Sequence, residues 1–200
     1  MNIPWNPKYI GAGILAATIA FAPVTLLAHD NGRHDDGYRE AAVIISAMEQ
    51  NQTRLPQLIE TAQKAGEGIA IGVEVEGESA LQFIEVTLLR DNEVLRVTLS
   101  PLTGEVIKVG SPEIIDSAIA RLTKQYDSLK TSKITLQEAV IIAEEAEKGF
   151  AYHAHAEDMD DWTGYEVNVM SNGRSIQVVI DPESGRVVGR KTKNRHHDEH

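Results

Sequence analysis

The sequence predicts an α+β fold of two repeated units, each a helix packed on a small antiparallel sheet. The first observation is a repeat: at an offset of 81 positions, residues 55–109 align with residues 136–190 without a gap. The second is a hydrophobic pattern common to both stretches. Apolar residues first recur at three- and four-residue spacing, as in a helix, and then alternate with polar residues, as in strands. One extra helix is expected before the first unit and one between the two.

The first unit is predicted over residues 38–109. The extra helix covers Tyr38–Gln50 and precedes the core repeat of residues 55–109. The helix of that repeat starts at Leu55, where Pro56 is tolerated in the first turn. The alternation then predicts strands over Ile69–Glu76, Ile84–Leu88 and Leu95–Leu99. A linker helix over residues 110–130 leads to the second unit.

The second unit is predicted over residues 131–190. Thr135 and Glu138 form a capping box at the start of its helix, and Gly149 is expected to end that helix in the left-handed conformation. Strands are expected over Phe150–Glu157, Tyr165–Val169 and Ile176–Ile180. Asn172-Gly173 predicts a two-residue turn, because both positions of such a turn need a positive φ.

Composition restricts the classes of function. Of the 200 residues, 19 are Lys or Arg and 30 are Asp or Glu, so the net charge is −11. This balance argues against binding to nucleic-acid phosphates or anionic lipid, since both need clusters of basic residues. The absence of Cys excludes disulfide bonds, thiolate metal sites and a cysteine nucleophile.

Residues 1–28 are predicted to be a secretory signal peptide. A positive charge and an apolar stretch over Tyr9–Ala22 come first, and Ala28 is a small residue at the expected cleavage site. The alternative is an uncleaved anchor, because Tyr9–Ala28 is just long enough to cross a bilayer. With cleavage, the protein is expected to be periplasmic or secreted and free of the membrane.

Both units close with the same kind of hairpin. The second contains Asp181-Pro182-Glu183-Ser184-Gly185-Arg186-Val187, and the first contains Ser100-Pro101-Leu102-Thr103-Gly104-Glu105-Val106, with Ser in place of Asp. In each, Pro presets φ and Gly is expected in the left-handed conformation. Together with the helix start Thr135-Leu136-Gln137-Glu138-Ala139, these hairpins resemble the PepSY domain. The resemblance implies a tandem PepSY protein.

The PepSY resemblance implies a non-catalytic module that inhibits or regulates peptidases near the cell, and small exported members are associated with envelope signalling. It supplies neither catalytic residues nor a cofactor. We therefore expect an envelope protein, either a peptidase or a sensor, as the partner. Docking would use an exposed sheet edge or the grooves between the units. The sequence favours no particular oligomeric state.

Histidines suggest an alternative function, a periplasmic protein that binds Cu, Ni or Zn. His153 and His155 are two residues apart on a predicted strand, so their side chains share one face and can reach one metal ion. The competing interpretation is a solvated strand face. The polar tails expected over residues 29–37 and 191–200 contain further weak candidates, namely His29, His34, His196, His197 and His200.

The sequence does not predict an enzyme. It contains no H-E-x-x-H, G-x-S-x-G or P-loop motif. The adjacent carboxylates Glu144-Glu145 and Asp160-Asp161 are candidates for acid–base chemistry, but nothing in the sequence around them indicates the burial that would tune an acid. Trp162 is a candidate anchor for a partner, with packing at the start of a strand as the alternative.

Overall fold

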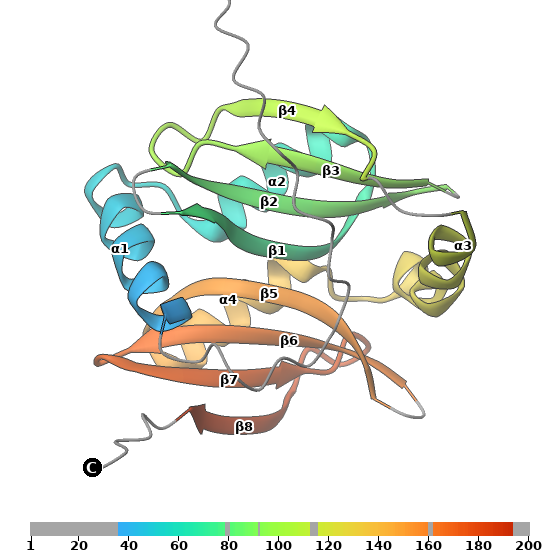
Figure 1. Ribbon diagram of the computed structural model, residues 1–200. Coiled ribbons are helices and arrows are strands. Elements are labelled where there is room, and N and C mark those ends of the chain that lie inside the picture. Colours follow the sequence, from blue (N-terminus) through green and yellow to red (C-terminus); the bar gives the residue numbers. More distant parts are fainter. Residues whose placement is uncertain (1–35, 79–80, 92, 113–115, 160–161, 194–200) are drawn as a thin grey trace, which may run out of the picture.

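The computed structural model describes residues 36–78, 81–91, 93–112, 116–159 and 162–193 (Figure 1). The predicted signal peptide lies outside these residues. So do the candidate metal ligands His29, His34, His196, His197 and His200 and the carboxylate pair Asp160-Asp161. What the sequence suggests about them stays a prediction.

The described residues form an α+β fold of four α-helices, one short 3-10 helix (η1) and eight strands, which confirms the predicted class. In chain order the elements are α1 (Asp36–Gln50), α2 (Leu55–Gly66), β1 (Ile69–Glu78), β2 (Leu81–Arg90), β3 (Glu93–Leu99), β4 (Val106–Gly110), α3 (Asp116–Gln125), η1 (Asp127–Thr131), α4 (Leu136–Glu147), β5 (Phe150–Met159), β6 (Trp162–Ser171), β7 (Arg174–Ile180) and β8 (Val187–Lys193). Two predicted bounds differ: α3 and η1 share the segment expected to be one linker helix, and β8 continues into the expected C-terminal tail.

All eight strands belong to one antiparallel sheet in the order β4-β3-β2-β1-β5-β6-β7-β8 (Figure 1). The prediction of two small sheets is therefore wrong in this respect. The two groups of four strands are joined where β1 pairs with β5, through Gly72 opposite His155 and Val73 opposite Ala154. Joining two edges satisfies main-chain groups that separate sheets would leave exposed. Alternation within a strand cannot predict which edges meet.

Helices α2 and α4 cover one face of the sheet, which we call the helix face (Figure 1). The core between these layers contains Leu58, Ile59, Val86 and Val97 from the first half and Leu136, Val140, Val167 and Val178 from the second, all with 0% or 1% exposure. Each such buried side chain contributes about 1.5–3 kcal/mol relative to an exposed one. We call the opposite face the open face; α1 and α3 lie toward the two ends of the strands (Figure 1).

The segment that links the two halves, which contains α3 and η1, is anchored beside one end of the strands (Figure 1). Leu122 of α3 and Tyr126, which follows α3, are buried, as the helical pattern predicts. The Tyr126 hydroxyl donates a hydrogen bond of 3.0 Å to the carbonyl oxygen of Ala156 in β5. Burial raises the pKa of this hydroxyl to about 12, so it remains a donor at any physiological pH.

A β-bulge changes which side chains of β5 face the core. The register shifts between Ala151 and His153, so Ala151 joins Ala154 on the helix face. Strict alternation predicts the opposite face for Ala151, and this part of the strand prediction is wrong. A bulge inserts one residue and restores the alternation beyond it, so His153 and His155 still share one face.

The start of α4 is as predicted, whereas its end differs by one residue. The Thr135 hydroxyl accepts the N–H of Glu138, and the Glu138 carboxylate accepts the N–H of Thr135. Lys148, not Gly149, takes the left-handed conformation, with φ 51°. Gly149 is instead required by space, because a Cβ there would overlap the carbonyl oxygen of Met170.

The predicted turns are confirmed. Asn172 and Gly173 have φ of 49° and 71°, as a two-residue hairpin turn of this kind requires. Gly104 and Gly185 have φ of 71° and 67° in the two closing hairpins. These are positions where a side chain would be strained, so the glycines set where each chain reversal occurs.

Candidate functional site

The candidate site lies on the open face where the two halves of the sheet meet. His153 and His155 alternate with the core residue Ala154, so both imidazoles lie on the open face, with ring centroids 5.0 Å apart. Both residues are half-buried, so they are less exposed than the predicted alternative of a solvated strand face implies. The shared face itself is as the sequence predicts.

Hydrogen bonds position the two imidazoles. Nε2 of His155 lies 3.0 Å from a carboxylate oxygen of Glu157, two residues along β5. Nδ1 of His153 lies 3.1 Å from the amide nitrogen of Asn168, a buried residue on β6. Because an amide nitrogen can only donate, His153 accepts at Nδ1. Each ring thus has one nitrogen fixed by a neighbouring side chain.

Three carboxylates gather beside the histidines, on the other side of the β1–β5 joint. Glu74 and Glu76 of β1 and Glu85 of β2 each place an oxygen within 4.8 Å of the others. One guanidinium offsets part of this charge: Nε of Arg96 on β3 lies 2.6 Å from a carboxylate oxygen of Glu85. We call these four residues the acidic cluster. No sequence pattern groups the three carboxylates, because only the register places Glu74 opposite Glu85.

The acidic cluster holds more negative charge than Arg96 can neutralise. Burial raises the pKa of Glu85 to about 7; Arg96 opposes this shift, while Glu74 and Glu76 add to it. The pKa of Glu74 is also raised, first by burial and then by the charge of Glu76. Glu85 and Glu74 therefore take up protons more readily than exposed carboxylates do.

This pKa shift predicts how stability depends on pH. A carboxyl whose pKa is higher in the folded state binds its proton more tightly there, and this tighter binding stabilises the fold. The stabilisation by Glu85 is complete below about pH 4.5 and is lost as the pH rises through about 7. Because water screens part of the effect, we expect Glu85 to account for about 1–2 kcal/mol of lost stability between these limits. Urea denaturation of wild type and Glu85→Gln from pH 4.5 to 8 measures this directly.

The substitution Glu85→Gln should remove most of this decrease in the free energy of unfolding with rising pH, which we call the pH slope. Glu105→Gln, in the exposed hairpin before β4, is the matched control and should keep the wild-type slope. Equal slopes in wild type and Glu85→Gln would contradict the assignment of the raised pKa.

A metal ion bound by His153 and His155 would be held more tightly if a third side chain also bound it. Among the residues that the structure describes, the only three metal-ligating side chains with ligand atoms this close together are Glu74, Glu76 and Glu85. Neither histidine belongs to this group, and Arg96 already pairs with one of its carboxylates. Within the described residues, no third metal-ligating side chain joins both histidines at this spacing.

The remaining candidates have structural environments. Glu144 is buried; one of its carboxylate oxygens accepts the N–H of Ala151 at 2.9 Å, and the other lies 2.9 Å from Arg54. Arg54 also lies over the ring of Phe150, 4.3 Å from its centroid. Glu144 therefore ties α4 to β5 and to the start of α2, whereas Glu145 is exposed.

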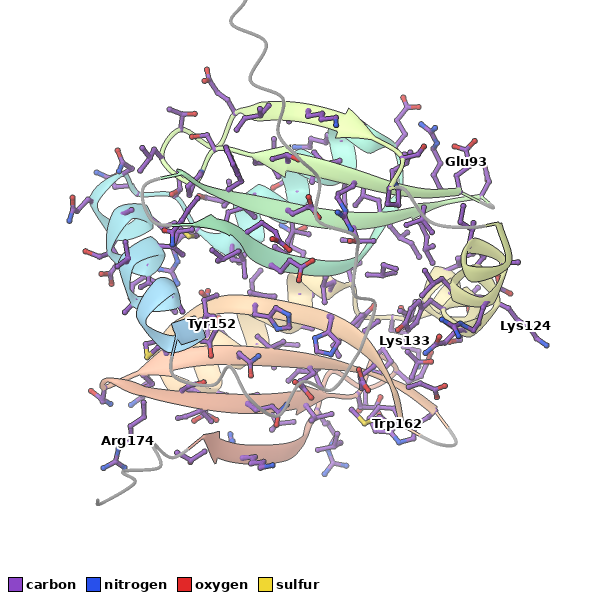
Figure 2. The ribbon with its side chains drawn as sticks, in the orientation of Figure 1. Glu93, Lys124, Lys133, Tyr152, Trp162 and Arg174 are labelled. Carbon is purple, nitrogen blue, oxygen red and sulfur yellow. The ribbon has the colours of Figure 1, made fainter. Side chains whose placement is uncertain are left out.

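Trp162 lies at the hairpin end of strands β5 and β6, while Tyr152 lies toward the opposite end of β5 (Figure 2). The ring of Trp162 is so close to Gly164 that a Cβ on this glycine would lie 2.9 Å from ring atoms. Packing at the start of a strand is one of the two roles expected for Trp162, although its side chain also remains partly exposed.

Comparison with known families identifies a PepSY domain, described as "Peptidase propeptide and YPEB domain", at residues 133–191. These residues comprise α4 and β5–β8, the second half of the sheet. PepSY domains are generally extracellular, non-catalytic and regulatory or associated with peptidases. The family resemblance that the sequence suggests is thus confirmed for the second half.

Two further comparisons add little to this result. A crystal structure described as a "putative lipoprotein" from Clostridium difficile 630 is similar with a TM-score of 0.42 and 16% identity, over 66% of this chain and 86% of that one. No curated protein matches the sequence. Among the described helices, none is sufficiently long and apolar to cross a membrane.

Proposed function

We propose that this protein is a non-catalytic module of the periplasm or cell exterior, built from two PepSY units, that binds and regulates another envelope protein, a peptidase or a sensor. The observation that supports it most is the PepSY domain at residues 133–191. This domain forms half of a sheet whose other half has the same order of elements: one helix, then four antiparallel strands.

Backbone details at the offset of 81 residues support a second PepSY unit in the first half, with its core repeat over residues 55–109. Both halves have a register shift in their first strand, between Ala70 and Gly72 and between Ala151 and His153. Both have another between their third and fourth strands. The residues with positive φ also correspond, in the pairs Glu67 and Lys148, Asp91 and Asn172, and Gly104 and Gly185.

Side-chain hydrogen bonds correspond as well. Gln63 accepts the N–H of Ala70 at 3.0 Å, just as Glu144 accepts the N–H of Ala151. In the closing hairpins, the Ser100 hydroxyl accepts two main-chain N–H groups, of Leu102 and Thr103. The Asp181 carboxylate does the same with Glu183 and Ser184, and these hydrogen bonds hold its pKa below the usual range.

Crosslinking in living cells tests the proposed function. We expect the exported protein, isolated after crosslinking, to carry one reproducible envelope protein that binds the purified chain again in isolation. A purified peptidase partner should then change its activity, and a sensor its signalling output, when the chain is added. An unrelated exported acidic protein is the control. A partner bound equally by that control, or no partner at all, would contradict the proposal.

The 5.0 Å separation of His153 and His155 favours metal binding as a second candidate function. For this function we expect calorimetry with Cu(II), Ni(II) and Zn(II) to give a Kd in the micromolar range or tighter. The heat of metal binding should disappear in the double variant His153→Ala/His155→Ala. Glu166→Gln, next to His155 in the register, is a control that should retain it. Heat that survives in the double variant would exclude this pair as the site.

A further inference from the structure

The ring of His155 is held in one orientation by a carboxylate. Nε2 of this ring lies 3.0 Å from a carboxylate oxygen of Glu157, and both residues belong to β5. An ionised carboxylate can only accept, so Nε2 carries the ring proton and donates the hydrogen bond. The side chains of His155 and Glu157 are 22% and 34% exposed, so the pair is partly shielded from water. Glu157 therefore fixes which nitrogen of His155 is protonated.

The other nitrogen of the same ring, Nδ1, is buried and has no hydrogen-bond partner among the described residues. In a neutral ring whose proton is on Nε2, Nδ1 presents a lone pair. A buried acceptor without a partner is uncommon in proteins, and each one calls for a specific reason. The lone pair of an imidazole nitrogen is a ligand that suits Zn(II), Cu(II) and Ni(II).

This arrangement is the one that surrounds histidines in metal sites. Such a histidine binds the metal ion through one ring nitrogen and donates the N–H of the other to a carboxylate, which orients the ring and makes the first nitrogen a stronger ligand. In His155, Glu157 accepts from Nε2, and Nδ1 is the nitrogen that remains. His153 is held differently, because its Nδ1 accepts a hydrogen bond from Asn168. The two rings of the candidate site are therefore not equivalent.

The separation of the two rings is also that of two imidazoles on one metal ion. A Zn–N bond is about 2 Å long and the ring centre lies about 1 Å beyond the nitrogen, so two imidazoles on a tetrahedral ion have ring centres about 5 Å apart. The ring centres of His153 and His155 are 5.0 Å apart, and the ring planes are inclined at 58°. The spacing of the pair already matches that of a metal-bound pair.

We propose that Glu157 is the positioning residue of a metal site in which His155 binds the ion through Nδ1. This inference rests on metal binding, the second candidate function, and adds the ligand atom, the residue that orients it and the class of ion. The class is a divalent ion of the Zn(II), Cu(II) or Ni(II) type, because Ca(II) and Mg(II) prefer oxygen ligands.

The protonation of the His155 ring is the first test, and its first step needs no metal. Nuclear magnetic resonance of the isotope-labelled full chain, at a mildly alkaline pH where free imidazole is neutral, should find the ring proton on Nε2. Adding Zn(II) should then shift the nitrogen signal of Nδ1 and leave the proton on Nε2. A ring proton on Nδ1 before metal is added, or loss of the Nε2 proton on adding Zn(II), would overturn the inference and leave metal binding intact as a candidate function.

Variants of Glu157 complete the test. Glu157→Leu removes the acceptor, and calorimetry should show Zn(II) binding weakened about 10- to 100-fold. Glu157→Gln keeps an acceptor oxygen for Nε2, so it should retain both the Nε2 proton and most of the affinity. Asp158→Asn is the matched control, because it removes the same charge from the next residue, which is exposed, and should change the affinity less than about twofold.

The outcomes separate the inference from the function on which it rests. Equal affinity of wild type and Glu157→Leu, or equal weakening in Asp158→Asn and Glu157→Leu, would show that Glu157 does not position the ring, although the metal site would stand. Absence of Zn(II), Cu(II) and Ni(II) binding to the wild-type chain would instead exclude the second candidate function together with the inference.

Discussion

Replacing Gly149 with Ala is expected to destabilise the protein by about 3 kcal/mol, because the new methyl group has no room. The space is taken mainly by main chain: a Cβ would overlap the carbonyl oxygen of Met170, and the side-chain atom Cγ1 of Val169 would lie 2.8 Å from it. A carbonyl in a sheet ladder cannot move without breaking its pairing. Urea denaturation followed by circular dichroism measures the free energy of unfolding.

The matched control is Gly72→Ala. Gly72 lies in β1, and a Cβ there would have its nearest contact, with His155, at 3.8 Å. This is ordinary van der Waals contact, so we expect a change within about 0.5 kcal/mol. Equal stability of the two variants would show that the main chain of β6 at Met170 can move to make room for the methyl group, which would contradict the prediction. Gly68 is the corresponding residue of the first half, where a Cβ would lie 2.7 Å from the carbonyl oxygen of Leu89.

Replacing Glu144 with Leu is expected to cost about 3 kcal/mol, since it leaves two partners without an acceptor. The buried N–H of Ala151 loses its hydrogen bond, and Arg54 loses its ion pair. Glu144→Gln keeps a carbonyl oxygen for Ala151, as Gln63 does for Ala70 in the first half. For this variant we expect a loss of about 1 kcal/mol. Thermal and urea unfolding of both variants measure the difference.

The comparison between the two substitutions separates the hydrogen bond from the ion pair. If Gln and Leu at position 144 lower the free energy of unfolding equally, the ion pair with Arg54 accounts for most of the effect. The hydrogen bond that resembles that of Gln63 would then contribute little to stability. If Gln is much better tolerated, the same main-chain N–H is satisfied in the same way in both halves. That result would strengthen the proposal of two PepSY units.

Part of the candidate site could be predicted from the sequence. The shared face of His153 and His155 follows from their spacing, because neighbouring side chains of a strand alternate. The acidic cluster could not be predicted in this way. Glu85 belongs to a different strand from Glu74 and Glu76, and only the pairing register brings their oxygens within 4.8 Å. Burial raises the pKa of Glu85, and burial is a property of the assembled sheet.

The amino-acid sequence by itself determined the features that depend on near neighbours: the capping box of α4, the glycine turns of the hairpins, the helix and strand order, and the PepSY pattern of residues 133–191. The tertiary structure decided what depends on distant segments. It joined β1 to β5 in one sheet, made β4 an apolar edge, and placed Glu144 between Arg54 and Ala151. Local patterns are set by the geometry of a few consecutive residues, whereas edge pairing and burial depend on which surfaces the whole chain brings together.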